Sequence, residues 1–454
     1  MGTVLCVDFG STFTKATLVD SADGTLLGTA AHPTTLGTDV LDGLRALERV
    51  LADQGLRADR VLACSSAGGG LRLAVVGFER AVTAEAGYRV GLSAGARVAH
   101  VTSGRLDDAG LAELAAQAPD VVLLVGGTDG GNADVLLHNA RRLAAAGLGA
   151  PVVVAGNVEV RERVVRTLRR GRVPAIPTAN VLPRLGVLDP QPARAAIREV
   201  FIRHVIGGKH LSASPAFAQM VRAATPDAVL AGVELLADGA GAVPGIGDVV
   251  VVDVGGATTD VYSVVTPDPE EAALHREVVE VLWRSRTVEG DLGVRWNAPG
   301  VVAAAAVERL LGPGEEESLG LAAAERSADP GLVPADDAGR DVDARLAELA
   351  LTVALRRHAR PQESAELRTP GKDLRQVRLV VGSGGVLRHA SPGRLARILA
   401  PVRADHAGGW KVPERAALAV DVRYVLAAAG LLAAEHPEAA ARLATGALAQ
   451  LPES

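Results

Sequence analysis

The chain has 454 residues, more than one hydrophobic core usually supports, so we expect at least two domains. Its composition, 48% hydrophobic and 22% charged, is that of a globular protein and excludes a largely disordered one. The formal net charge of −6 gives no general electrostatic reason to bind nucleic acid or an anionic membrane, so we expect neither as a partner.

The first motif begins within ten residues of the amino terminus. An apolar strand over Thr3 to Val7 leads into Asp8-Phe-Gly-Ser-Thr-Phe-Thr-Lys15, and a second strand is expected over Ala16 to Val19. A carboxylate, a glycine turn and hydroxyl groups between two strands predict a hairpin whose backbone N–H groups can bind phosphate. Taken alone, an Asp-x-Gly turn is more often only a tight turn. The residues expected to hold phosphate here are Gly10, Ser11, Thr12 and Lys15.

An inserted unit is expected after the first sheet. A strand over Leu26 to Ala31, a helix over Asp39 to Gln54 and a strand over Val61 to Ser65 come first. From Ala67 to about Arg203, apolar runs then alternate with amphipathic helices, which is typical of a parallel sheet covered by helices. Because this length exceeds what a minimal nucleotide-binding fold needs, we place an inserted α/β module there.

Within that stretch, Val125-Gly-Gly-Thr-Asp-Gly-Gly-Asn132 allows two interpretations. Thr128, Asp129 and Asn132 could orient an attacking water, because ligands collect at the carboxyl ends of parallel strands, and Asp129 is then a candidate catalytic residue. Alternatively, the glycines only turn the chain and Asn132 caps the next helix. If the segment belongs to the inserted module, it becomes a candidate surface for a partner.

The first motif is repeated past the middle of the chain, as Asp253-Val-Gly-Gly-Ala-Thr-Thr-Asp260 between strands over Val249 to Val252 and Val261 to Val265. Two such hairpins can face each other across one polyphosphate, which favours the functional interpretation of both. Asp8 and Asp253 repel phosphate, but they can order the hydration shell of Mg²⁺ bound to it. The residues expected to hold phosphate in this copy are Gly255, Gly256, Thr258 and Thr259.

A third glycine motif follows a strand over Val377 to Val381. Its sequence is Gly382-Ser-Gly-Gly-Val386, and the missing side chains allow a flat ligand to approach the backbone. We expect Gly382, Gly384 and Gly385 to border adenosine. By contrast, the segment Gly312 to Arg340 is rich in glycine, proline and acidic residues and is expected to be a mobile surface excursion rather than a core element.

The order phosphate, phosphate, adenosine resembles the superfamily of sugar kinases, actin and the seventy-kilodalton heat-shock chaperones. That resemblance implies an α/β, actin-like ATPase fold with two ribonuclease-H-like lobes around a nucleotide cleft. It also implies two helices that cross at the hinge, expected at about Asp227 to Asp238 and Glu414 to Ala434, with Gly232 and Ala427-Ala-Ala-Gly430 allowing a close crossing. Glu289 lies in the region that supplies groups around ribose and adenine in this superfamily, although a solvated turn is the alternative.

Several segments together resemble the glutamate mutase accessory proteins of the MutL or GlmL type, which share only a name with the mismatch-repair MutL. They are the two hairpins, Val125 to Asn132, Val154-Ala-Gly-Asn157, Pro177-Thr-Ala-Asn-Val-Leu-Pro183 and Thr287-Val-Glu-Gly-Asp-Leu-Gly293. The resemblance runs through most of the chain and implies an actin-like ATPase that serves an adenosylcobalamin-dependent carbon-skeleton mutase.

The expected organisation is a first lobe over residues 1–66, the inserted module over 67–203 with part of it belonging to the first lobe, and a connecting region over 204–247. A second lobe over 248–412 and C-terminal helices over 413–454 that return to the first lobe complete it. Cys6 and Cys64 lie in apolar strands and are expected to be buried and unpaired. With no leader sequence evident, we expect a cytoplasmic protein.

We therefore expect a slow ATPase that binds ATP, ADP and Mg²⁺ and uses cleft motion to release damaged cobalamin from the mutase. A small-molecule kinase on the same fold is the alternative; it requires an acceptor pocket with a catalytic carboxylate, for which Asp129 is the candidate. A filament-forming relative is disfavoured, because the tail over Glu435 to Ser454 has few positive charges to anchor it. Homo-oligomerisation stays open.

Overall fold

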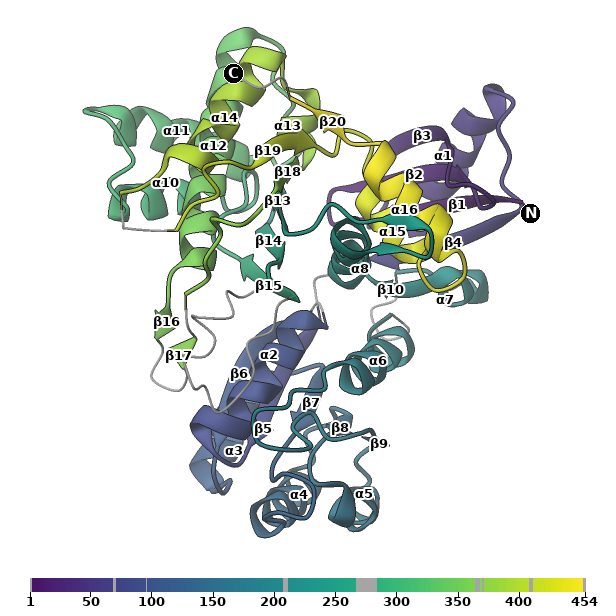
Figure 1. Cartoon of the computed structure of the whole chain (residues 1–454), viewed down its shortest axis with the longest axis vertical. Coiled ribbons are helices and arrows are strands. Elements are labelled where there is room, and N and C mark those ends of the chain that lie inside the picture. The colour runs from purple at the N-terminus through teal and green to yellow at the C-terminus, as the bar shows by residue number, and fades with distance from the viewer. Residues whose placement is uncertain are drawn as a thin grey trace.

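The computed structural model describes residues 2–67, 71–94, 96–206, 211–266, 284–363, 368–369, 371–407 and 411–451. Figure 1 shows three parts: a first lobe with purple strands and yellow C-terminal helices, a second lobe in green, and a blue module below them.

The first lobe is built on a sheet in the order β10-β4-β1-β2-β3. Its elements are β1 (Thr3–Phe9), β2 (Phe13–Asp20), β3 (Leu26–Pro33), α1 (Val40–Asp53), β4 (Arg60–Ser65) and β10 (Val221–Ala224). β1 pairs antiparallel with β2 and parallel with β4. Because side chains alternate along a strand, Leu5 and Val7 pack in the core that contains α1, whereas Val4 and Cys6 pack in a second core.

The second lobe repeats this arrangement. Its sheet has the order β15-β14-β13-β18-β19-β20. The strands are β13 (Val249–Val254), β14 (Thr259–Val264), β15 (Arg284–Glu289), β18 (Leu379–Ser383), β19 (Ala417–Val420) and β20 (Ala449–Gln450). β13 pairs antiparallel with β14 and parallel with β18, as β1 does with β2 and β4. Two lobes with the same strand order confirm the predicted actin-like fold.

Helices and short strands complete the second lobe. They are α10 (Ala298–Val307), α11 (Glu315–Ala328), α12 (Asp337–Ala359), β16 (Gln362–Glu363), β17 (Arg368–Thr369), α13 (Gly385–His389) and α14 (Pro392–Ala404). The short hairpin of β11 (Gly239–Ala240) and β12 (Val243–Pro244) packs instead against the C-terminal helix α16 (Pro437–Gly446). The prediction that Gly312 to Arg340 contains no core element was wrong. Leu319 and Ala323 of α11 are buried, and Arg326 donates to Asp343 Oδ1 of α12 at 2.6 Å.

The two hinge helices, α8 (Thr225–Asp238) and α15 (Val425–Leu432), lie against each other at the centre of the molecule (Figure 1). A Cβ atom at Gly232 would lie 2.0 Å from the carbonyl oxygen of Leu426, and one at Gly430 would lie 1.8 Å from that of Ala228. The predicted close crossing at small residues is therefore confirmed. The predicted helix over Glu414 to Ala434 is wrong in its first part, because Ala417–Val420 forms β19; helix α16 (Pro437–Gly446) follows α15.

The module lies between β4 and β10 in the chain and contains a parallel sheet in the order β6-β5-β7-β8-β9. Its elements are β5 (Arg72–Gly77), η1 (Arg80–Ala84), α2 (Glu85–Ser93), β6 (Arg97–Ser103), α3 (Asp108–Ala116), β7 (Val121–Leu124), α4 (Asp134–Ala146), β8 (Val152–Val154), η2 (Val158–Val160), α5 (Arg161–Arg170), β9 (Ala175–Pro177), α6 (Gln191–Val200) and η3 (Phe201–Ile206). Helix α7 (Pro215–Met220) follows and lies beside β10 and β4 of the first lobe (Figure 1). Leu73, Val75 and Val121 belong to the same hydrophobic core as Leu5 and Val7. The module is therefore packed onto the first lobe rather than tethered to it.

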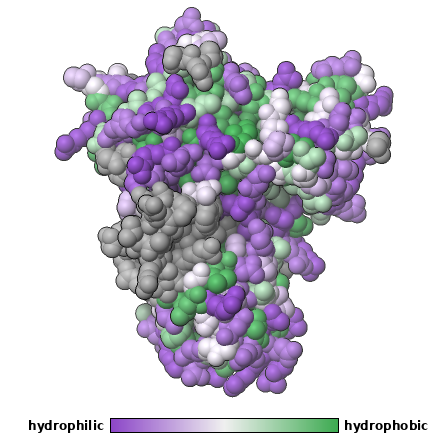
Figure 2. Space-filling model, viewed as in Figure 1, coloured by the Kyte–Doolittle hydropathy of each residue, from purple (hydrophilic) through white to green (hydrophobic). Residues whose placement is uncertain are grey.

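The surface carries many polar residues, and both cysteines are in the interior. On the face shown in Figure 2, polar and charged residues, in purple, cover most of the lower end of the molecule. Cys6 and Cys64 are buried and free, as predicted. Among the described residues, no helix combines the length and the apolar character that crossing a membrane requires.

Candidate functional site

The two predicted hairpins have the same turn. The N–H of Gly10 donates to the carbonyl oxygen of Phe13 at 3.1 Å, and that of Gly255 donates to Thr258 at 2.9 Å. Asp8 stands opposite Lys15 across the first hairpin, and Asp253 stands opposite Asp260 across the second. Turn, carboxylate and register thus match between the lobes.

The tips of the hairpins meet. A Cβ atom at Gly256 would lie 3.4 Å from Thr12 Oγ1, so the second turn passes close to the side chain of the first. Within the described part of the chain, Thr12 Oγ1 is buried and has no hydrogen-bond partner. The structure therefore brings together two turns that lie far apart in the chain. It leaves a buried hydroxyl at their junction, to which a polar ligand could form a hydrogen bond.

Lys15 lies at the centre of this junction. Its Nζ is 3.7 Å from Asp8 Oδ2 and 3.9 Å from the centre of the Tyr424 ring. Burial alone would lower the pKa of Lys15, but Tyr424, Asp8, Asp253 and Asp421 outweigh it, so its pKa is raised and the ammonium stays charged. The cation belongs to the first lobe, whereas Asp253 and Asp421 belong to the second.

The starts of both hinge helices reach this centre. Thr225, the first residue of α8, donates its hydroxyl to Asp8 Oδ1 at 2.5 Å. Asp421 follows β19 and accepts hydrogen bonds from the N–H groups of Val425 and Leu426, at 2.9 and 3.1 Å, where α15 begins. Burial is the main cause that raises the pKa of Asp421.

Sequence reasoning missed Thr225, Asp421 and Tyr424 as site residues. An Asp shortly before an apolar helical run is a helix-start signal that could have identified Asp421. Thr225 and Tyr424 carry no such local signal, because only the packing of α8 and α15 against the hairpins brings them there.

The other hydroxyl residues of the hairpins differ in whether they can contact a ligand. Ser11 is exposed at the first turn. The hydroxyl of Thr258 contacts Asp260 Oδ2 at 3.3 Å, whereas that of Thr259 is fully buried and donates to the carbonyl oxygen of Leu292 at 2.6 Å. Asp260 is itself paired with Arg286 at 2.8 Å. The Thr259 hydroxyl thus stabilises the lobe, and Thr258 is the better placed of the two to face a ligand.

The third glycine motif lies beside the second hairpin, because Ser383 pairs with Asp253 across β18 and β13. Packing requires two of its glycines: a Cβ atom at Gly382 would lie 2.4 Å from the Leu387 side chain, and Gly384 has a φ of 110° and would place a Cβ 2.1 Å from the carbonyl oxygen of Val254. A Cβ atom at Gly385 would meet no atom within 4 Å. Gly385 is therefore the position at which a ligand has room.

Glu289 lies at the outer end of β15, opposite Thr259. Its Oε2 accepts a hydrogen bond from Arg357 at 2.8 Å, and Arg357 also pairs with Asp291. Burial is the largest influence on Glu289 and raises its pKa. Glu289 is thus at the edge of the second hairpin and is engaged by an arginine of α12.

Asp129 follows β7 of the module, whose sheet is separate from the sheets that carry the two hairpins. Its Oδ1 accepts hydrogen bonds from the N–H of Val158 at 3.1 Å and from Asn180 Nδ2 at 2.9 Å, which joins the loops after β7, β8 and β9. Asn132 accepts from the N–H of Asp134 at the start of α4, at 3.0 Å. These contacts favour the interpretation of Val125 to Asn132 as a helix-capping loop of the module.

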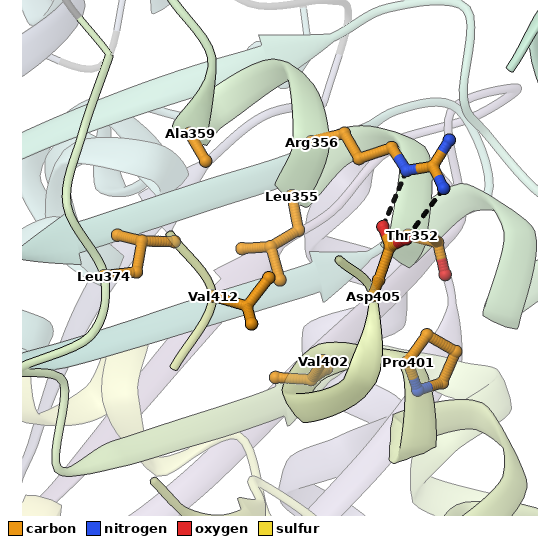
Figure 3. A pocket seen from close by; sticks show the side chains of 9 residues that line it. All are labelled: Thr352, Leu355, Arg356, Ala359, Leu374, Pro401, Val402, Asp405 and Val412. Atoms are coloured by element: carbon orange, nitrogen blue, oxygen red, sulfur yellow. Dashed lines mark hydrogen bonds and ion pairs between the residues drawn. The ribbon is translucent and has the colours of Figure 1, made fainter. Parts of the chain in front are cut away.

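A shallow hollow in the second lobe lies elsewhere (Figure 3). Side chains of α12 and α14, with Leu374 and Val412, line it, and Arg356 at its border donates two hydrogen bonds to Asp405, at 2.6 and 2.7 Å. None of the predicted site residues borders it. In the described chain, no group of three or more His, Cys, Asp or Glu side chains is arranged to hold a metal ion directly.

The chain is similar to known proteins along most of its length. The chain is similar to Protein MutL of Clostridium tetanomorphum, with 37% identity over 458 residues that cover 98% of each chain. Among solved structures it is similar to a nucleotide-free acetone carboxylase, with 16% identity, a TM-score of 0.40, and coverage of 95% of this chain and 70% of the other. It is also similar to the activator of 2-hydroxyisocaproyl-CoA dehydratase from Clostridium difficile with bound ADPNP, with 11% identity, a TM-score of 0.31, and coverage of 97% and 98%. The family model for the MutL protein matches residues 4–448, and the chain belongs to this family.

Proposed function

We propose that this protein is an ATP-dependent accessory protein that reactivates an adenosylcobalamin-dependent carbon-skeleton mutase of the glutamate mutase type. The observation that supports it most is the junction of the two hairpins, where Lys15 of one lobe lies among carboxylates of both lobes. The family membership supports the choice of partner.

In this proposal the nucleotide binds between the hairpins. Backbone N–H groups of Ser11, Thr12 and Gly256 and the ammonium of Lys15 hold the phosphates. Asp8 and Asp253 order the water around Mg²⁺, and the ion neutralises phosphate charge. Adenosine occupies the space beside Gly385, next to the second hairpin.

The hinge helices carry the nucleotide state to the rest of the molecule. Asp8 is bonded to the start of α8 through Thr225, and Asp421 holds the start of α15. Helix α8 is in turn joined to α6 of the module, because Arg194 pairs with Glu234 at 2.9 Å and lies 3.6 Å from Asp227. A nucleotide that changes the contacts of Asp8 would therefore bias the position of the module, our candidate surface for the mutase.

The chemistry of the mutase gives a reason for such a helper. Adenosylcobalamin reacts through homolysis, and a radical lost in a side reaction leaves the enzyme holding an inactive cobalamin. Removing a tightly held cofactor requires a conformational change from outside, which a two-lobed ATPase can supply if its nucleotide states differ in their contacts with the partner.

The test loads a mutase of this type with damaged cobalamin and follows cobalamin release by absorption spectroscopy. We expect release to be faster with this protein and MgATP than with either alone, and activity to return when fresh adenosylcobalamin is added. An Asp253→Asn variant should not accelerate release. If the wild-type protein with MgATP leaves release unchanged for every cobalamin-dependent mutase of the source organism, the reactivation proposal fails.

The kinase alternative gains no support from the described residues. Its candidate carboxylate, Asp129, belongs to the module and is engaged by Val158 and Asn180. The same protein can be tested with MgATP and small hydroxylated or carboxylated acceptors: rapid turnover with the phosphate appearing on the acceptor would replace the accessory role by a kinase.

A further inference from the structure

The ring of Tyr424 contacts a cation from each lobe. Lys15 Nζ of β2 lies 3.9 Å from the ring centre, and the guanidinium carbon of Arg388 lies 4.8 Å from it. Arg388 is on α13, which begins at Gly385, the position of the third glycine motif that has open space beside it. Two positive side chains from opposite lobes thus converge at the proposed phosphate and adenosine positions.

Arg388 is half-buried, and within the described residues its guanidinium makes no hydrogen bond and no ion pair. A guanidinium has five N–H donors in a planar fork that suits carboxylate or phosphate oxygens. Three other arginines near the second hairpin are engaged. Arg286 pairs with Asp260, Arg357 pairs with Glu289, and Arg295 pairs with Asp343. Arg388 differs from them because its guanidinium lies over an aromatic ring. The face of that ring offers no hydrogen-bond acceptor atom.

The backbone that carries the ring has a constrained conformation. Tyr424 has a φ of 55°, in the left-handed region that residues other than glycine rarely adopt. It immediately precedes α15, where the N–H groups of Val425 and Leu426 are bonded to Asp421. The backbone at Tyr424 is therefore held independently of the cations, and the ring offers each cation a weaker partner than a charged oxygen would.

We propose that Arg388 is a second phosphate-binding cation beside Lys15, and that the Tyr424 ring holds both cations until a nucleotide arrives. This rests on the nucleotide site of the proposed function. On binding, the guanidinium leaves the ring and donates to phosphate oxygens, so the second lobe contributes a charge that its hairpin lacks, because Asp260 stands there in the position of Lys15. Arg388 then links closure of the second lobe to the phosphates of the nucleotide.

The test compares MgADP with adenosine by titration calorimetry for the wild type, Arg388→Ala, Arg388→Lys and Tyr424→Phe. We expect Arg388→Ala to weaken MgADP binding about tenfold, which is about 1.4 kcal/mol, and to leave adenosine binding unchanged. Arg388→Lys should recover most of the affinity, because it restores the charge. Tyr424→Phe keeps the ring and should bind MgADP as the wild type does. The thermal unfolding midpoint of Arg388→Ala should match that of the wild type.

Three results would overturn the inference. If Arg388→Ala binds MgADP as tightly as the wild type does, Arg388 does not touch phosphate. If it loses the same factor for adenosine and MgADP, the side chain stacks on the base or only supports the fold. If Arg388→Lys is as weak as Arg388→Ala, charge is not what matters. In each of these cases the wild type still binds MgADP, so the proposed function stands; a wild type that binds no nucleotide would instead overturn both.

Discussion

At the scale of single residues, the two hairpins are alike in backbone and carry opposite charges at one matching position. Lys15 and Asp260 occupy matching positions in the two hairpins, each across from a carboxylate. In the first hairpin the cation balances Asp8, whereas in the second Asp260 needs Arg286 from the neighbouring strand. The two hairpins therefore share a backbone geometry, and of the two only the first places a cation opposite its carboxylate.

The pair Asp8 and Asp253 gives the first prediction. Replacing either by Ala should weaken binding of MgADP more than binding of ADP in the presence of a chelator, because the role that we propose for each carboxylate is to order the water around the metal. Asp42→Ala, on the surface of α1 beside Arg45, serves as a control and should change neither. Calorimetry with and without Mg²⁺ measures this, and equal losses in both conditions would mean that the carboxylates only support the turns.

His358 gives a second prediction, for stability against pH. It is buried on α12, with Nε2 2.8 Å from Ser263 Oγ and Nδ1 2.9 Å from Thr287 Oγ1. Burial, followed by the charge of Lys372, lowers the pKa of His358 well below 6.5. In the unfolded chain His358 is protonated as the pH falls below about 6.5, whereas in the folded protein it stays neutral. The free energy of unfolding therefore falls as the pH drops below that value.

Urea unfolding at several pH values measures this effect. The limiting slope for one such group is about 1.4 kcal/mol per pH unit. A His358→Gln variant lacks the titrating group, so its free energy of unfolding should decline less steeply than that of the wild type between about pH 6.5 and 5. Parallel profiles for the two proteins would show that another group controls the acid response.

The site was predictable where its residues are neighbours in the chain. Asp8, Gly10 and Lys15 fall within one hairpin, so alternating strands and turn chemistry sufficed to place them together. Tyr424 and Asp421 reach the same centre only because β19 pairs with β18 and α15 packs on α8. No spacing along the chain encodes those contacts, which is why sequence reasoning left them out.

At the scale of elements, composition misled where it conflicted with pairing. Ala417–Val420 belongs to an alanine-rich run that favours a helix, yet it forms a strand because β18 offers it a parallel partner. Helix α11 was overlooked because glycine, proline and acidic residues surround it, although Arg326 joins it to α12 through Asp343. In both cases a contact distant in sequence outweighed the local preference.

The crossing of α8 and α15 gives a third prediction. Gly430→Ala places a methyl group against the carbonyl oxygen of Ala228, so the helices must separate, and we expect a loss of about 1–3 kcal/mol in the free energy of unfolding. Gly320→Ala is a matched control in α11, because its methyl would meet no atom within 4 Å, and it should be neutral or stabilising by about 0.5–1 kcal/mol. Chemical denaturation measures the free energy of unfolding of both variants. If the two variants are equally stable, the helix crossing tolerates the methyl group and the prediction is wrong.

At the scale of the whole molecule, the fourth prediction concerns rate. With Asp129 in the module, the described hairpins hold no residue assigned to position an attacking water, so basal ATP hydrolysis should be slow. Binding of the mutase should raise it by closing the lobes. A phosphate-release assay with and without the mutase tests this, and a fast basal rate that the mutase does not change would contradict it.

The last prediction concerns the contact with the mutase. Deleting the module would be uninformative, because Leu73 and Val121 share a core with Leu5 of the first lobe. Leu185, in the loop after β9, is 68% exposed, so Leu185→Asp can probe the module without disturbing that core. Leu321→Asp is the matched control, since Leu321 is 72% exposed on α11 of the second lobe.

We expect Leu185→Asp to weaken association with the mutase in surface-plasmon resonance while MgADP binding stays as in the wild type, and Leu321→Asp to change neither. The expected loss is about tenfold, or 1.4 kcal/mol, because a charge would replace an apolar contact at the interface. If Leu321→Asp is the variant that loses the mutase, the contact lies on the second lobe, and the nucleotide would act on the partner through α11 rather than through α8, Arg194 and the module.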